Sequence, residues 1–197
     1  MVRAFRYIKF VYRAYAISCA VGFTLFFLTI SVMSLTRNPP NPPYTETERV
    51  ILQAMSVASY DQYLELPELT RGQWKSRVNR AAGTNFYVEW FRDLPTPARA
   101  IPQLRVVIMN NSLLHTDDWG YYAGTLLHEL VHLQHYSPHE RRVTFHTFKL
   151  AWESGDKHLR AIALPSTTGH ERSSHYNADG LIIEYLKKRG EFNFESI

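Results

Sequence analysis

The feature that most constrains this chain lies in residues 124–136, a His-Glu-x-x-His motif made by His128, Glu129 and His132. If this stretch is helical, the two histidines are four residues apart and share one face. Their imidazoles can then bind one metal ion while Glu129 reaches a water molecule beside it. Three protein ligands and a water are the usual surroundings of a catalytic zinc ion. The motif therefore predicts a helix that carries two zinc ligands, His128 and His132, and a catalytic glutamate, Glu129.

The residues around the motif favour this helix. Asp117 or Asp118 can cap its start, and the run from Trp119 to Tyr136 is long enough for several turns. An aliphatic face with Ala123, Leu126 and Leu130 lies opposite the histidines, so the helix can pack on a core and still expose them. The competing interpretation is an amphipathic helix whose histidines only make hydrogen bonds.

The N-terminal region predicts a membrane anchor. Residues 1–13 carry four basic side chains and no acidic one, and residues 14–35 form a run of 22 residues without a charge. That length is typical of a membrane-spanning helix. The positive charges before the run place the N-terminus in the cytoplasm and the rest of the chain outside it, in the periplasm if the cell is bacterial. A cleaved signal peptide is the rival interpretation, but its apolar region is usually shorter and ends in a small-x-small site.

Composition and charge set the expected domains. We expect a tail and anchor over residues 1–37, a proline-rich spacer over 38–44 and a catalytic domain over 45–197. After residue 37 the chain holds 17 basic and 18 acidic residues, which argues against a nucleic-acid-binding domain. The single cysteine, Cys19, lies in the apolar run, so the domain has neither disulfides nor cysteine ligands. The sequence does not indicate an oligomeric state.

The expected domain is α+β and follows the N-terminal transmembrane helix. A capping box, Thr45 to Glu48, predicts a helix to about Leu64. The other expected elements are a helix over 73–82, strands over 85–91 and 104–109 with a proline-containing loop over 94–102 between them, and a helix from Ser137-Pro138 to Gly155. The β-branched residues in 142–147 leave a strand open for the last of these.

A third zinc ligand is expected beyond Trp152. Residues 175–188 predict a helix on which His175 and Asp179 share an otherwise aliphatic face. A polar pair on such a face needs a partner, and a zinc ion would be one; a buried hydrogen-bonded pair is the alternative. His175 is the expected ligand, with Asp179 or Glu171 still open for that place.

The motif at 128–132, followed by His175-Tyr-Asn-Ala178-Asp179, resembles the pattern of gluzincin-type zinc metallopeptidases, a branch of the zincins. In the Ste24-like proteases the second motif is Glu-x-x-Ala-Asp, whose glutamate binds zinc and whose aspartate braces the site. The resemblance implies that His175 is the third ligand, although it stands where that family has glutamate, and that Asp179 supports the ligands. It also implies that an edge strand beside the cleft binds the substrate backbone as an added strand.

The expected activity is hydrolysis of peptide bonds in a protein or peptide substrate, by a zinc-bound water that Glu129 activates. Two other classes stay open, a non-catalytic anchored domain that binds a partner, and a zinc hydrolase acting on a non-protein or cell-wall substrate. A developing oxyanion also needs a hydrogen-bond donor. The candidates by position are His158, His170, Arg172 and Tyr176.

Overall fold

The computed structural model describes residues 14–28, 41–84, 86–92, 94–115, 118–135, 139–168 and 176–192. The chain divides into two compact units, Met1–Pro40 and Asn41–Ile197. The second unit contains the His-Glu-x-x-His motif and every strand that the structure describes.

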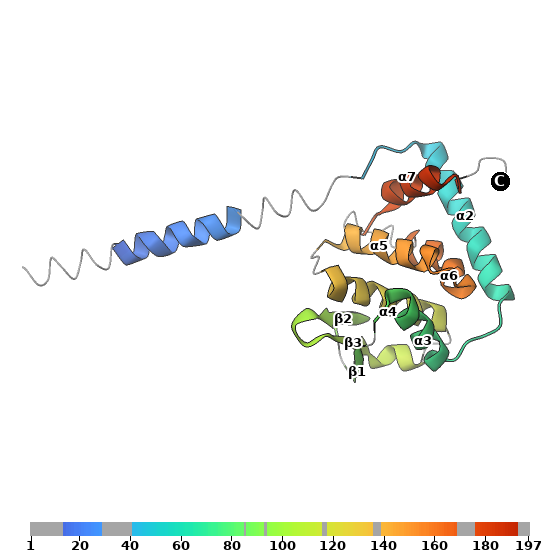
Figure 1. Ribbon diagram of the computed structural model, residues 1–197, viewed down its shortest axis with the longest axis horizontal. Coiled ribbons are helices and arrows are strands. Elements are labelled where there is room, and N and C mark those ends of the chain that lie inside the picture. Colours follow the sequence, from blue (N-terminus) through green and yellow to red (C-terminus); the bar gives the residue numbers. More distant parts are fainter. Residues whose placement is uncertain are drawn as a thin grey trace, which may run out of the picture. The chain divides into compact units, whose positions relative to one another are not determined.

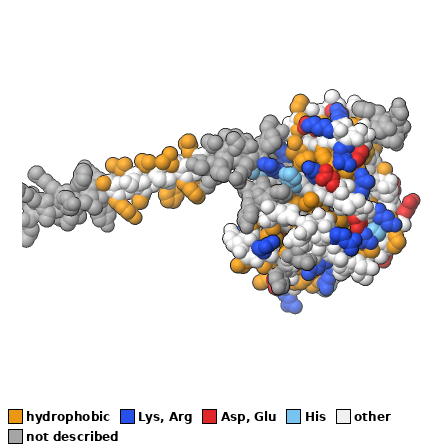
Figure 2. Space-filling view, viewed as in Figure 1, with side chains coloured by type: hydrophobic (Ala, Val, Ile, Leu, Met, Phe, Trp, Pro, Cys, Tyr) orange, Lys and Arg blue, Asp and Glu red, His pale blue; other side chains and the backbone are white. Residues whose placement is uncertain are grey.

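The described part of the first unit is a helix over residues 14–28, with every side chain exposed. Hydrophobic side chains are prominent along the side of this helix seen in Figure 2. A 15-residue helix extends about 22 Å at 1.5 Å per residue, whereas the hydrocarbon core of a bilayer is about 30 Å thick. Across the residues that the structure describes, no helix combines the length and the apolar character needed to cross a membrane. The expected transmembrane anchor over 14–35, and with it the single-pass location, is therefore wrong; residues 29–35 lie outside the described residues.

The second unit is mainly helical, with one small sheet, so the expected α+β class is also corrected (Figure 1). Its elements in chain order are α2 (Glu46–Glu65), α3 (Arg71–Ala82), β1 (Tyr87–Phe91), β2 (Ala98–Ile101), the short 3-10 helix η1 (Pro102–Leu104), β3 (Val106–Asn110), η2 (Asn111–His115), α4 (Trp119–His135), α5 (Glu140–Glu153), α6 (Lys157–Thr168) and α7 (Asp179–Arg189).

Local capping signals account for several helix ends. Thr45 and Glu48 form the expected capping box at the start of α2, and Thr70 with Gln73 forms another at α3. Gly83 ends α3 in the left-handed conformation with φ 63°, which glycine adopts without steric cost. Asp118 accepts a hydrogen bond from the Tyr121 backbone N–H at 2.9 Å, so it caps α4 as expected.

The sheet has the strand order β1-β3-β2, with β1 parallel and β2 antiparallel to β3. The two strands expected at 85–91 and 104–109 correspond to β1 and β3. The edge strand β2 lies inside the expected loop 94–102 and was not predicted. Its sequence, Ala-Arg-Ala-Ile, has little β propensity, so its pairing with β3 decides its conformation.

The helix that carries the motif, α4, is at the centre of this unit. It packs against α3, α5, α6 and β2, and Figure 1 shows it between the sheet and the pair α5 and α6. The expected aliphatic face is buried: Ala123, Leu126 and Leu130 are 0–1% exposed. Because this face packs in the core, the opposite face of α4, which carries the histidines, is directed toward β2 and α5.

Basic and acidic side chains are interspersed over the surface seen in Figure 2.

Two helices differ from expectation. The helix expected from Ser137-Pro138 is α5, which begins at Glu140 after the N-cap residue His139 and ends at Glu153; the strand alternative is excluded. The helix expected over 175–188 is α7, which begins only at Asp179. Residues 176–178 precede α7 and are not helical, and His175 lies outside the described residues. Helix α6 was not predicted from the sequence.

Candidate metal centre

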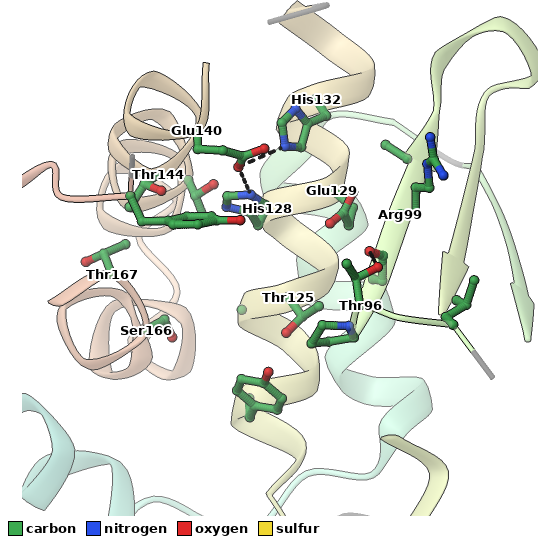
Figure 3. Close-up of a pocket in the computed structure, with 18 of the residues that line it drawn as sticks. Thr96, Arg99, Thr125, His128, Glu129, His132, Glu140, Thr144, Ser166 and Thr167 are labelled. Carbon is green, nitrogen blue, oxygen red and sulfur yellow. Dashed lines mark hydrogen bonds and ion pairs between the residues drawn. The ribbon is translucent and has the colours of Figure 1, made fainter. Parts of the chain in front are cut away.

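The structure brings three ligating side chains together, and one of them was not expected. One carboxylate oxygen of Glu140, Oε2, lies 3.0 Å from Nε2 of His128 and 3.3 Å from Nε2 of His132 (Figure 3). One ligating atom from each of these residues lies within 4.8 Å of the others, so the group could hold a metal ion. His128 and His132 come from α4, and Glu140 is the first residue of α5.

The local geometry explains why these groups meet. The two histidines are four positions apart along α4, so both rings project from the same face, and their centroids are 5.0 Å apart. Helix α4 ends at His135 and α5 begins at Glu140. Helix α5 packs against α4, and its first turn lies opposite the histidine face of α4, as Figure 3 shows.

The donor set fits zinc. Two imidazole nitrogens and one carboxylate oxygen form one of the ligand sets that catalytic zinc sites use. With metal–ligand bonds of about 2.1 Å, two donors of a tetrahedral site stand about 3.4 Å apart. The separations of 3.0 and 3.3 Å between Glu140 and the two histidines are close to that value.

The charge state of Glu140 also suits a ligand. Burial raises the pKa of the Glu140 carboxyl, but hydrogen bonds from His128 and His132 outweigh burial and lower it from 4.5 to about 2. The side chain is therefore ionised at neutral pH, which is the form that binds a cation.

Glu129, the expected catalytic residue, lies on the other side of the histidine pair. Figure 3 shows its carboxyl group directed toward the strand that carries Arg99, away from Glu140. Burial raises the pKa of Glu129, while the neighbouring His128 and His132 and a hydrogen bond from the Ala100 backbone N–H act in the opposite direction and offset only part of this rise. A raised pKa is typical of a carboxylate that accepts and releases protons near neutral pH.

The edge of β2 that faces the site has a defined set of hydrogen-bonding groups. The Asn110 N–H donates to the Pro97 carbonyl at 2.8 Å, so the antiparallel alternation turns the N–H and C=O of Ala98 and Ala100 to the free edge. The Thr96 hydroxyl donates to the Ala98 carbonyl at 2.8 Å, and Glu129 accepts from the Ala100 N–H. Of the four backbone groups on this edge, the Ala98 C=O and the Ala100 N–H thus have side-chain partners.

These residues line one cleft of about 770 Å³ between β2, α4, α5 and α6. Its walls include polar side chains from three successive helices. They are Thr125 on α4, Thr144 and Thr147 on α5, and Ser166 and Thr167 on α6. Gly124 allows α4 to approach α6 here, because a Cβ at this position would lie 2.8 Å from the Ser166 Oγ atom.

Tyr176 also lines the cleft. Its ring centroid is 6.4 Å from that of His128. Burial raises the pKa of its hydroxyl, and the charges of Glu140 and Glu129 raise it further. The hydroxyl is thus protonated at neutral pH, and it lies close enough to both carboxylates for their charges to raise its pKa.

The other expected site residues have different positions. His175 and Glu171, like the donor candidates His170 and Arg172, lie outside the described residues. Asp179 is buried, and its N–H donates to the Asn177 side chain at 3.0 Å, but it is not among the described residues that line the cleft. His158 packs edge-on against Trp74 with its Nε2 3.3 Å from the Pro67 carbonyl, so it belongs to the core.

Glu140 is the residue that sequence reasoning missed. The helix expected from Ser137-Pro138 placed Glu140 in its first turn, and the third ligand was sought only beyond Trp152. The available signal was a carboxylate at the start of the expected helix that immediately follows the motif helix.

Comparison of the chain with protein-family models, with curated proteins and with solved structures finds no match.

Proposed function

We propose that this protein is a zinc-dependent hydrolase of peptide bonds, with His128, His132 and Glu140 as the metal ligands and Glu129 as the proton-transfer residue. The observation that carries the proposal is the position of Glu129. It lies next to the histidine pair, in the same cleft, on the side opposite the third ligating group. A site that served only to hold the fold together would have no use for a carboxylate there.

A zinc ion in this site would act as a Lewis acid toward a carbonyl oxygen and make a bound water acidic enough to lose a proton near neutral pH. Glu129 supplies the base. Its task is to accept a proton and return it to the leaving nitrogen. Because the pKa of Glu129 is raised above that of an ordinary glutamate, its carboxylate is a stronger base and suits this transfer better.

The hydrogen bond from the Ala100 N–H holds the Glu129 carboxylate against β2. Proton transfer depends on such fixed geometry, because a base that rotates freely spends little time within reach of its proton.

Tyr176 is the candidate donor to the developing oxyanion. Its hydroxyl carries its proton at neutral pH, and its ring lies beside His128 at the cleft wall. Among the four donor candidates drawn from the sequence, Tyr176 and His158 are described, and only Tyr176 lines the cleft. A donor at this position stabilises charge that appears only in the transition state.

Zinc content and peptide cleavage test the proposal together. Full-length wild type, Glu129→Gln and His128→Ala are reconstituted with zinc, desalted, and assayed on a degenerate peptide library read by mass spectrometry. We expect about one zinc per chain in wild type and in Glu129→Gln, with cleavage reduced by about 100-fold or more in the latter. His128→Ala should lose both zinc and cleavage. Equal cleavage by wild type and Glu129→Gln, or a wild type that binds no zinc, would refute the proposal.

A further inference from the structure

Residues Asn41–Tyr44, the first of the second unit, lie along the start of α7. The Asn41 side-chain amide donates to the Asn177 backbone carbonyl at 2.9 Å and lies 3.4 Å from the Asn177 side-chain oxygen. That side-chain oxygen accepts the Asp179 N–H at 3.0 Å. Figure 1 shows the segment before α2 passing the beginning of α7. The turn around Asn177 is thus bonded to a segment 136 residues earlier in the chain.

Gly180 shows how closely this segment is seated. A Cβ atom at position 180 would lie 2.6 Å from the Pro42 backbone carbonyl oxygen and 3.1 Å from the Tyr44 ring. Backbone cannot give way as a flexible side chain can, so only glycine permits this approach. The conformation of Gly180 itself is helical, and α7 alone would accept alanine there.

The turn that this segment holds is the one that carries Tyr176. Tyr176 is adjacent to Asn177, so their Cα atoms are about 3.8 Å apart and a shift of one moves the other. Tyr176 lines the metal-centre cleft, with its ring 6.4 Å from His128, whereas residues 41–44 do not. The contacts of Asn41 therefore act on the cleft from outside it.

We propose that residues 41–44 form a strap that positions Tyr176 at the metal centre, with Asn41 as the positioning residue and Gly180 as the site where the strap is seated. The catalytic consequence rests on the proposed function, since it requires Tyr176 to act on a reacting group. That the strap holds Tyr176 in place does not depend on the proposed function. The strap makes the geometry of the cleft depend on a segment next to the boundary between the two units at Pro40.

Three variants of the full chain separate this role from simple stabilisation. Asn41→Ala removes the donor from the strap, and Gly180→Ala displaces the strap from the side of α7. Thr45→Ala is the matched control, because it breaks the capping box of α2 next to the strap but leaves the Asn41–Asn177 hydrogen bond intact. The thermal midpoint of each variant records the general loss of stability.

The position of Tyr176 is read by ¹⁹F NMR on protein labelled with 3-fluorotyrosine, with its resonance assigned from Tyr176→Phe. We expect Asn41→Ala and Gly180→Ala to move this resonance toward its position in urea, and Thr45→Ala to leave it in place despite an equal or larger fall in thermal midpoint. In the zinc-loaded enzyme, both strap variants should lower kcat by between about tenfold and 100-fold with KM within about twofold. Adding Asn41→Ala to Tyr176→Phe should cause no further loss.

The strap is refuted if the resonance stays in place in both strap variants, or if it moves as far in Thr45→Ala. If no variant or wild type cleaves any peptide, the proposed function fails, but the ¹⁹F spectra still decide whether the strap positions Tyr176. If the resonance moves and kcat does not, Tyr176 is held by the strap and has no role in catalysis, which refutes the catalytic part.

Discussion

Oε2 of Glu140 lies 3.0 Å from Nε2 of His128, although the two residues belong to different helices. With this contact, His128, His132 and Glu140 form a group of three side chains that could hold a metal ion. Experiments on the metal centre therefore have to test Glu140 as well as the two histidines.

The first prediction concerns the third ligand. Glu140→Ala should weaken zinc binding by more than about 100-fold, because the loss of a direct ligand exceeds the 10–100-fold cost of losing a residue that only orients one. His175→Ala tests the residue expected from the sequence. Competition with a chelator of known affinity measures both. Full zinc affinity in Glu140→Ala together with its loss in His175→Ala would assign the third position to His175 instead.

A second prediction concerns the pH dependence of the metal-free protein. The pKa of Glu140 is about 2 in the folded state and 4.5 for an ordinary glutamate. As the pH falls through 4.5 the unfolded chain takes up a proton that the folded chain does not, so folding loses stability between pH 4.5 and about 2. Above pH 4.5 this contribution is fully present.

Glu140→Gln should therefore make the urea midpoint of the metal-free protein less dependent on pH in that window. Glutamine preserves the shape and can still accept a hydrogen bond, so the comparison isolates the charge. Parallel stability curves for wild type and variant between pH 5 and 2.5 would show that the histidines do not stabilise this carboxylate.

Glu129 should behave in the opposite way, because its pKa is raised. A carboxyl with a raised pKa costs stability once the pH rises above its ordinary value, since the folded state holds a charge that burial disfavours. Glu129→Gln should stabilise the metal-free protein at pH 7 by roughly 0.5–2 kcal/mol, a usual size for a stabilising substitution.

Calorimetry of the two metal-free proteins at pH 7 and pH 4 checks this expectation, and the gain should shrink at the lower pH. A metal-free Glu129→Gln protein that is less stable than wild type at pH 7 would show that the interaction of the Glu129 charge with His128 and His132 outweighs the cost of burial.

The contact between α4 and α6 gives a prediction about packing. Gly124→Ala would bring a methyl group 2.8 Å from the Ser166 Oγ atom. Overpacking usually costs about 1–3 kcal/mol, which exceeds the gain in helix propensity of up to about 1 kcal/mol. Removing the hydroxyl with Ser166→Ala should recover at least about 0.5 kcal/mol in the double variant.

Gly72→Ala is the matched control, because a Cβ at that position in α3 would meet no atom within 4 Å. It should stabilise the protein or leave it unchanged in urea denaturation. A Gly124→Ala variant as stable as Gly72→Ala would mean that α6 moves aside at no cost, and that the glycine is not needed for the close approach.

The elements that sequence reasoning identified are those that local interactions determine. The capping box at Thr45, the glycine stop at Gly83 and the cap at Asp118 each involve residues within four positions of one another. The strand β2 was missed because Ala98–Ile101 has little intrinsic preference for a strand and becomes one by pairing with β3. The anchor at 14–35 was inferred from apolar composition, and the structure describes no membrane-spanning helix there.

The sequence by itself determined the histidine pair and Glu129, because a helical repeat of 3.6 residues places His128 and His132 on one face whatever the rest of the fold does. Only the tertiary structure decided the partner of that pair. Glu140 faces the histidines because α5 packs back against α4, and Tyr176 reaches the cleft from a turn bonded to Asn41. Contacts of this kind depend on how separate helices pack, and no periodicity within a single segment encodes them.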